Sequence, residues 1–212
     1  MSSKNNILNR LRKAQQPFTD IEPIKNRRKM VNLDEASLAE LATRFSEEAE
    51  KLSCYVYHVK DNQEALNTVF SLLEESQAVL AWEDDKLPFP IKEALSEKQI
   101  EIAEYNNTFI NIGITGVDAG IASTGSLVLS SGQGKFRTAS LLPDKHITLI
   151  NSSQLVPDFE TWIQAEKDSG AKAFKESSNT VIISGPSKTA DIAQELIKGA
   201  HGPRQVHIIL IE

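Results

Sequence analysis

Segments with a helical spacing of apolar residues alternate with short, almost continuously apolar segments along most of this chain. The first pair is typical. Residues 32–52 carry apolar side chains three and four positions apart, and CYVYHV at 54–59 follows as an extended run. Such alternation is the pattern of a sheet whose strands are connected by helices. It predicts an α/β domain with a twisted, largely parallel sheet and helices on both faces.

The predicted elements continue in this manner to the end of the chain. Helices are expected over 32–52, 61–76, 90–101, 156–169 and 187–200, and strands over 54–59, 77–82, 109–116, 124–131, 146–152, 180–186 and 205–211. Asn32 or Asp34 is expected to cap the first helix with its short polar side chain. Between 116 and 124 we expect only a short turn of helix.

The first 31 residues differ from the rest in charge. Residues 1–30 hold eight Lys or Arg and only two acidic residues, Asp20 and Glu22, so this segment has a net charge of about +6. Because the whole chain has a net charge of −6, the remaining residues carry about −12. Apolar side chains share one face of residues 4–16, so we expect a short basic amphipathic helix followed by a linker, and a separate domain over 32–212. Two roles stay open for this segment: a tail without a partner, or an arm that docks a partner or makes a homo-oligomer.

Composition excludes several classes of protein. The acidic domain argues against a nucleic-acid-binding surface, and we expect no membrane span and a cytoplasmic location, because no secretory signal and no long apolar segment is present. Cys54 is the single cysteine, so no iron–sulfur cluster or structural zinc is expected in this chain. Cys54 is interpreted as a buried thiol at a strand.

The familiar nucleotide and metal motifs are absent. A P-loop ending at Lys188-Thr189 would need glycine where Ile182 and Ser187 stand, and Arg137 stands where Gly132-Gln-Gly134 would need its third glycine. The histidines at 58, 146 and 207 lie in strand-like runs without a metal-ligand spacing. We therefore expect hydrogen-bonded structural histidines there and no metal site.

Three polar, glycine-rich segments follow predicted strands, at 113–126, 130–137 and 184–191. Because ligands of open α/β sheets gather at the carboxyl ends of strands, these segments predict the binding site. The expected ligand contacts are Thr124, Gly125, Ser126, Lys135, Arg137, Gly185, Ser187, Lys188, Thr189 and Arg204, and the expected acid or base groups are Asp118, Asp191 and His201. The segment 130–137 equally fits a plain hairpin.

Ser187, Thr189 and Asp191 stand where a predicted strand gives way to a predicted helix. They would cap the free N–H groups of the first helical turn, or those groups and Lys188 would hold a phosphate or carboxylate. Both readings remain open at this point. At the other end of the predicted helix, a glycine C-cap and Pro203 explain the termination, but they leave His201 and Arg204 unexplained.

Four linked motifs carry a resemblance to a known family: GITGVDAGIASTGSLVLSSG, RTASLLPDKHI, ISGPSKTADI and GAHGPRQVHIIL. In this order and spacing, residues 50–212 resemble the LUD-domain family. The resemblance implies a fold similar to the sugar-phosphate isomerase, CoA-transferase and formyltetrahydrofolate cyclo-ligase group. It also implies a role in oxidising L-lactate to pyruvate beside two partner proteins that carry the iron–sulfur machinery.

Two positions depart from the family pattern. Ser123 and Ala193 stand where the resemblance leads us to expect acidic residues. A carboxylate at these places cannot serve as acid or base in this chain, which leaves Asp118, Asp191, Glu195 and His201. The expected function is a component of an L-lactate oxidation system that binds a small anionic ligand at the strand-end loops. The alternatives are a free-standing enzyme of the same fold group, such as an ATP-dependent cyclo-ligase or a sugar-phosphate isomerase, and a noncatalytic assembly subunit.

Overall fold

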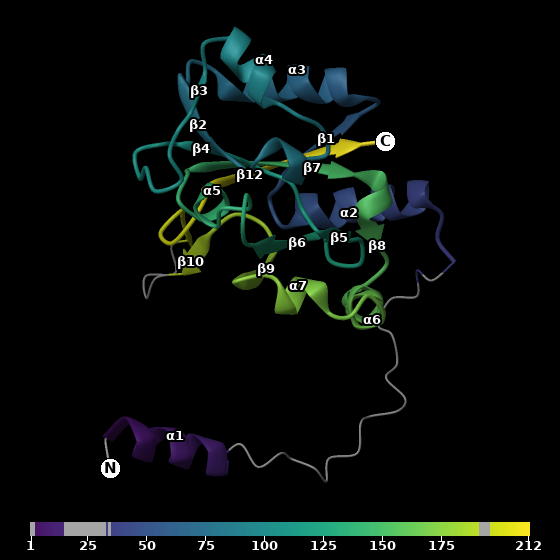
Figure 1. Cartoon of the computed structure of the whole chain (residues 1–212). Helices are drawn as coiled ribbons and strands as arrows, with labels where there is room; N and C mark the ends of the chain where they lie inside the picture. The colour runs from purple at the N-terminus through teal and green to yellow at the C-terminus, as the bar shows by residue number, and fades with distance from the viewer. Residues whose placement is uncertain (1–2, 15–32, 34, 191–195) are drawn as a thin grey trace. The chain divides into compact units, whose positions relative to one another are not determined.

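A computed structural model describes residues 3–14, 33, 35–190 and 196–212 of the chain (Figure 1). It separates into two compact units, Met1–Met30 and Val31–Glu212. In the first unit the structure describes helix α1 (Ser3–Ala14), whose last turn carries Arg12 and Lys13. The expected amphipathic helix is therefore confirmed, with slightly earlier bounds.

The second unit contains a large parallel sheet and a smaller mixed sheet. The large sheet has the strand order β1-β12-β7-β4-β2-β3, and all its neighbouring strands are parallel. Its strands are β1 (Tyr55–Val59), β2 (Ala78–Ala81), β3 (Glu101–Ile102), β4 (Ile112–Thr115), β7 (Lys145–Asn151) and β12 (Gln205–Ile211). The predicted largely parallel sheet is thus confirmed.

Helices α3 (Asn62–Leu73) and α4 (Lys92–Glu97) cover one face of the large sheet (Figure 1). Their buried side chains pack with those of β4, β7 and β12 in one hydrophobic cluster. Strands β7 and β12 are buried almost throughout, and the IILI run of β12 is the pattern of a strand buried on both faces. A short 3-10 helix, η1 (Asp84–Lys86), follows β2.

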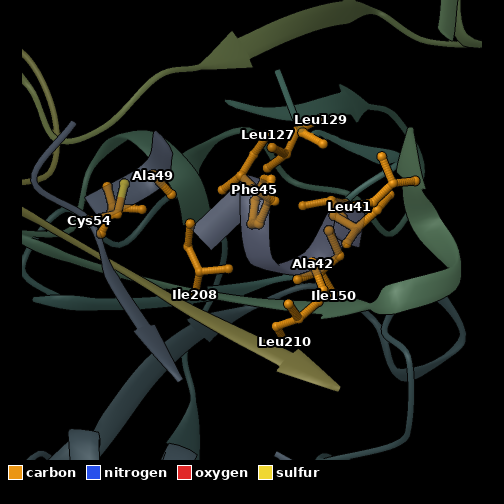
Figure 2. Packing of buried hydrophobic residues seen from close by; sticks show 14 of the residues in the cluster. Leu41, Ala42, Phe45, Ala49, Cys54, Leu127, Leu129, Ile150, Ile208 and Leu210 are labelled. Atoms are coloured by element: carbon orange, nitrogen blue, oxygen red, sulfur yellow. The ribbon is translucent and has the colours of Figure 1, made fainter. Parts of the chain in front are cut away.

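The opposite face of the large sheet packs on α2 (Leu38–Lys51), which lies between the two sheets (Figure 2). Phe45 is fully buried there, among Leu127 of the small sheet and Ile208 of the large one. The predicted cap at Asn32 or Asp34 is wrong. Helix α2 begins at Leu38, and Ser37 makes a capping box with Glu40 because its hydroxyl accepts from the Glu40 N–H and the Glu40 carboxylate accepts from the Ser37 N–H.

The small sheet was not predicted. It has the order β8-β5-β6-β9, formed by β5 (Ala119–Ile121), β6 (Ser126–Ser131), β8 (Leu155–Val156) and β9 (Asn179–Ile183). The segment read as a turn of helix is strand β5, which pairs antiparallel with β6 and parallel with β8. Its outer face packs on Trp162 of α6 (Phe159–Asp168), and α7 (Lys172–Lys175) lies beside β9. The turn η2 (Ser152–Gln154) and helix α5 (Thr138–Leu141) complete this part.

Candidate functional site

The predicted site residues fall into separate groups. The first lies beyond the carboxyl end of β4, where the Asp118 carboxylate forms an ion pair with Lys135 (Oδ1 to Nζ, 2.5 Å) and accepts from the Ser130 N–H. Lys135 is the last residue of a tight turn at 132–135, and its Nζ lies 5.4 Å from the centre of the Trp82 ring. Both charged side chains are largely buried. Each charge therefore has a partner within the chain, and their predicted acid/base and anion-binding roles stay predictions.

The glycines of segment 113–126 allow close packing of the protein against itself. Gly125 has φ +62°, and a Cβ there would lie 2.1 Å from the backbone nitrogen of Ala49 in α2. A Cβ on Gly116 would lie 2.7 Å from the Lys86 carbonyl oxygen. The close approach that these glycines permit is thus to neighbouring backbone.

The hydroxyls of this segment form a short chain. Thr124 Oγ1 donates to Ser126 Oγ (2.9 Å), and Ser126 Oγ lies 2.8 Å from Ser184 Oγ. Ser126 is buried, whereas Thr124 is exposed. These hydrogen bonds connect β6 to Ser184, the residue that follows β9. Thr124 and Ser126, two predicted ligand contacts, therefore join the small sheet to the segment after β9.

The predicted helix over 187–200 is wrong in the part that the structure describes. Lys188–Ala190 and Leu196–Lys198 form the antiparallel strands β10 and β11, with Thr189 opposite Ile197. Asp191 lies outside the described residues. No helix N-terminus is therefore present at Ser187 to bind an anion.

Backbone hydrogen bonds across the base of this hairpin replace those of the expected helix. The Ser187 N–H donates to the Pro203 carbonyl (2.8 Å), and the Ser187 carbonyl accepts from the Gly199 N–H (2.9 Å). The Ser187 hydroxyl also accepts from the His201 N–H (3.4 Å). These bonds give backbone N–H and C=O groups partners that differ from those of a helix, so they favour the hairpin over the helix. They bring residues 184–187 beside residues 199–203.

Two predicted anion-binding cations have partners within the chain. Lys188 Nζ donates to the carbonyl of Leu52, the C-cap residue of α2 (2.7 Å), and to Ser53 Oγ (3.0 Å). Arg204 Nε lies 3.6 Å from Asp144 Oδ1, in an exposed pair. The positive charge of Lys188 thus interacts with the negative end of a helix.

Four predicted residues do come together, around a pocket of about 270 Å³. Arg137, Gly185, Ser187 and His201 line it. Its walls are otherwise mainly apolar, formed by Leu141, Val181, Ile182, Ile183, Pro203 and Val206. The pocket lies between α5, β9 and the base of the hairpin, at the amino ends of β7 and β12. The predicted site lay at the carboxyl edge of the parallel sheet. The pocket lies elsewhere because β6 and β9, the strands before two of the predicted segments, pair antiparallel in the separate small sheet.

The charge of this pocket favours an anion. Arg137 is exposed and has no ion-pair partner among the described residues, and no Asp or Glu in the described part of the chain lines the pocket. A guanidinium with its donors unused binds a carboxylate or phosphate in a bidentate manner. A concave, mostly apolar pocket with a few convergent polar groups is the usual form of a small-molecule site.

Sequence reasoning missed one further pocket residue, His146 of β7. Its side chain is fully buried, its Nε2 lies 2.8 Å from Thr115 Oγ1 and 3.1 Å from Thr148 Oγ1, and its Nδ1 has no hydrogen-bond partner. Burial lowers the pKa of His146 to about 3, so its imidazole is neutral near pH 7. The sequence signal was Thr148 two positions along the same strand, on the same face as His146.

The other predicted features have simpler outcomes. Cys54 is buried just before β1, and burial raises the pKa of its thiol to about 11. His207 and His58 are hydrogen-bonded in strands, as expected, to Tyr57 and Ser46 respectively. Within the described ranges, no cluster of three or more His, Cys, Asp or Glu is placed to hold a metal ion. None of the described helices is long and apolar enough to cross a membrane.

Comparisons with known proteins agree with this architecture. The family model of the LUD domain matches residues 42–211. Lactate utilization protein C of Halalkalibacterium halodurans is 32% identical over 193 residues, which cover 85% of this chain and 83% of that protein. A protein of the same name from Shouchella clausii is 28% identical, over 85% of this chain and 82% of its own length.

One solved structure supports the fold. The crystal structure of a DUF162 family protein from Deinococcus radiodurans has a TM-score of 0.62 and 20% sequence identity, and the match covers 83% of this chain and 99% of that one. The family match spans the described sheets from α2 to β12, and the first of these relatives extends over most of the chain. The chain therefore belongs to the LUD-domain family.

Proposed function

We propose that this protein is a component of an L-lactate oxidation system, in which it works beside iron–sulfur partner proteins. Two relatives that match most of the chain are named Lactate utilization protein C, and this supports the pathway. The single cysteine is buried with a raised thiol pKa, so it is a poor ligand for a cluster and a poor nucleophile. Electrons released by lactate oxidation would then pass through the partners.

We further propose that the pocket around Arg137 binds a small anionic ligand of this system. The observation that carries the proposal is that Arg137 and His201, together with Gly185 and Ser187, converge from three segments of the chain on one pocket in which the arginine has no ion-pair partner among the described residues. Arg137 would hold the anionic group at the solvent-exposed side. His201, also exposed and at the rim, would donate a hydrogen bond or move a proton.

A deletion strain tests the pathway. Loss of this gene should abolish growth on L-lactate but leave growth on pyruvate unchanged, and the wild-type gene should restore it. Normal growth of the deletion strain on L-lactate would contradict the proposed pathway. Co-purification of the protein with two cysteine-rich partners would support the assembly.

A second experiment tests the pocket. A deletion strain that carries Arg137→Gln should fail to grow on L-lactate. In calorimetry, the affinity of the purified variant for the anion should fall by about tenfold or more, because a charge-assisted contact is lost. Lys175→Gln, at an exposed position in α7 outside the pocket, is the matched control and should behave as wild type. Arg204→Gln should have a smaller effect than Arg137→Gln, since Arg204 pairs with Asp144.

A further inference from the structure

Two buried polar residues line the pocket: Ser140, whose hydroxyl donates to the Arg137 carbonyl, and His146, which has a ring nitrogen without a hydrogen-bond partner. Two threonine hydroxyls lie within hydrogen-bond distance of its Nε2, at 2.8 and 3.1 Å, and hold the ring in place. Nδ1 has no partner, although the side chain is fully buried and lines the pocket. Buried polar groups are nearly always hydrogen-bonded, so this nitrogen is suited to a ligand atom.

The polar groups of the pocket differ in charge and in exposure. Arg137 is cationic and exposed, while His146 is buried and, because burial lowers its pKa to about 3, neutral. A neutral imidazole favours an uncharged donor or acceptor, since a second charge at the buried end would carry a large desolvation cost. Apolar side chains such as Leu141 and Val206 also line the pocket.

The volume of the pocket also restricts its ligand. Lactate has six non-hydrogen atoms and would fill at most roughly 180 Å³, even if each atom took the ~30 Å³ share of a liquid water molecule. The pocket holds about 270 Å³. A three-carbon acid would leave part of the apolar wall uncovered, so a larger molecule fits better.

From these observations, and resting on the proposed function for the anion at Arg137, we infer the ligand class of the pocket. The ligand is an amphiphilic acid larger than lactate, with its anionic group at Arg137, an apolar body along the pocket walls and an uncharged hydrogen-bonding atom at His146 Nδ1. His146 is then a ligand-contacting residue that determines specificity, and Thr115 and Thr148 are positioning residues.

Matched pairs of acids test this inference on the purified full chain. 4-Hydroxyphenylacetate should bind about fivefold more tightly than phenylacetate, and 6-hydroxyhexanoate more tightly than hexanoate, because one net hydrogen bond is gained. L-Lactate and pyruvate should bind more weakly than the hydroxylated acids. His146→Phe should remove the preference within each pair. His58→Phe, which changes an exposed histidine on β1, should retain it.

Nitrogen NMR of the wild-type protein keeps the test valid if His146→Phe fails to fold. The Nδ1 resonance of His146 should shift on addition of 4-hydroxyphenylacetate and stay nearly unchanged with phenylacetate. Equal binding within both pairs, or a His146 resonance that responds to neither acid, would overturn the inference. These readouts do not depend on growth, so a deletion strain that grows normally on L-lactate would contradict the pathway while leaving the ligand class standing.

Discussion

Gly125 illustrates at the scale of one residue how a predicted ligand contact serves the fold. Its φ of +62° and the 2.1 Å separation of an added Cβ from Ala49 N oppose any side chain. Gly125→Ala should therefore lower the free energy of unfolding by roughly 3–5 kcal/mol, from backbone strain and overpacking together. Urea unfolding measures this change.

Substitutions at two other glycines distinguish the effect of backbone strain from that of overpacking. Gly170 has φ +88° but open space around an added Cβ, so Gly170→Ala should cost only about 1–2 kcal/mol. At Gly132, whose nearest neighbour would be 3.8 Å away, alanine should change the free energy of unfolding by less than about 0.5 kcal/mol. Equal effects at all three positions would contradict the packing of Gly125 on α2.

The site residues show what residue patterns can and cannot predict. Arg137, Gly185 and Ser187 were predicted because polar residues and glycines after strands mark ligand sites, and His201 because the end of the predicted helix left it unexplained. All four line the pocket, and their roles in binding stay predictions. His146 was missed because a histidine inside an apolar run has the same pattern whether both ring nitrogens are bonded or only one. Whether Nδ1 has a partner depends on the tertiary packing around His146, in which Thr115 of β4 contacts only Nε2.

At the scale of elements, the buried parallel strands were predictable and the hairpin was not. Strand β12 ends in the run IILI, which is apolar on both faces, so its own residues identify it. The hairpin β10–β11 has helix-favouring residues, and its conformation depends on Ser187 bonds to residues 199, 201 and 203. Tertiary contacts override local propensity there. The small sheet was not predicted because two of its strands, β5 and β8, are only three and two residues long.

Lys188 links this hairpin to α2, and its substitution tests that link. Lys188→Met removes a donor from the Leu52 carbonyl and a positive charge from the C-terminal end of α2, so stability should fall by about 0.5–1 kcal/mol. Lys198→Met, opposite Lys188 in the hairpin register, is the matched control and should have a smaller effect. Ligand affinity should remain at the wild-type value in both variants. A large loss of affinity in Lys188→Met would instead support its predicted anion-binding role.

At the scale of the whole molecule, buried histidines should make stability dependent on pH. The pKa of His207 is lowered to about 4, first by burial and then by the charge of Lys145, and that of His146 to about 3. Their ordinary value is 6.5, so the unfolded chain binds more protons below that pH. Their contribution is complete above pH 6.5 and is lost as pH falls towards 4 and 3.

Each histidine should lower the free energy of unfolding by about 1.4 kcal/mol per pH unit below 6. Urea unfolding at several pH values between 7 and 4.5 measures the slope. In His207→Gln the slope should decrease by the equivalent of about one proton. An unchanged slope in this variant would show that other groups cause the acid sensitivity.

The N-terminal unit carries the last prediction, because the apolar face of α1 is exposed. Ile7 and Leu11 are more than half exposed at 56% and 55%, and the helix has twelve residues, a length that is marginal in isolation. We propose that copies of α1 pack together through this face. Light scattering should then give the full chain a larger mass than one copy, and the chain without residues 1–31 the mass of a monomer. Leu11→Asp should also give a monomer, since it places a charge in the apolar face, whereas Lys4→Gln should retain the assembly. Equal masses per copy for the full and shortened chains over a wide concentration range would exclude self-association through α1 and leave docking of a different protein as the role of this basic arm.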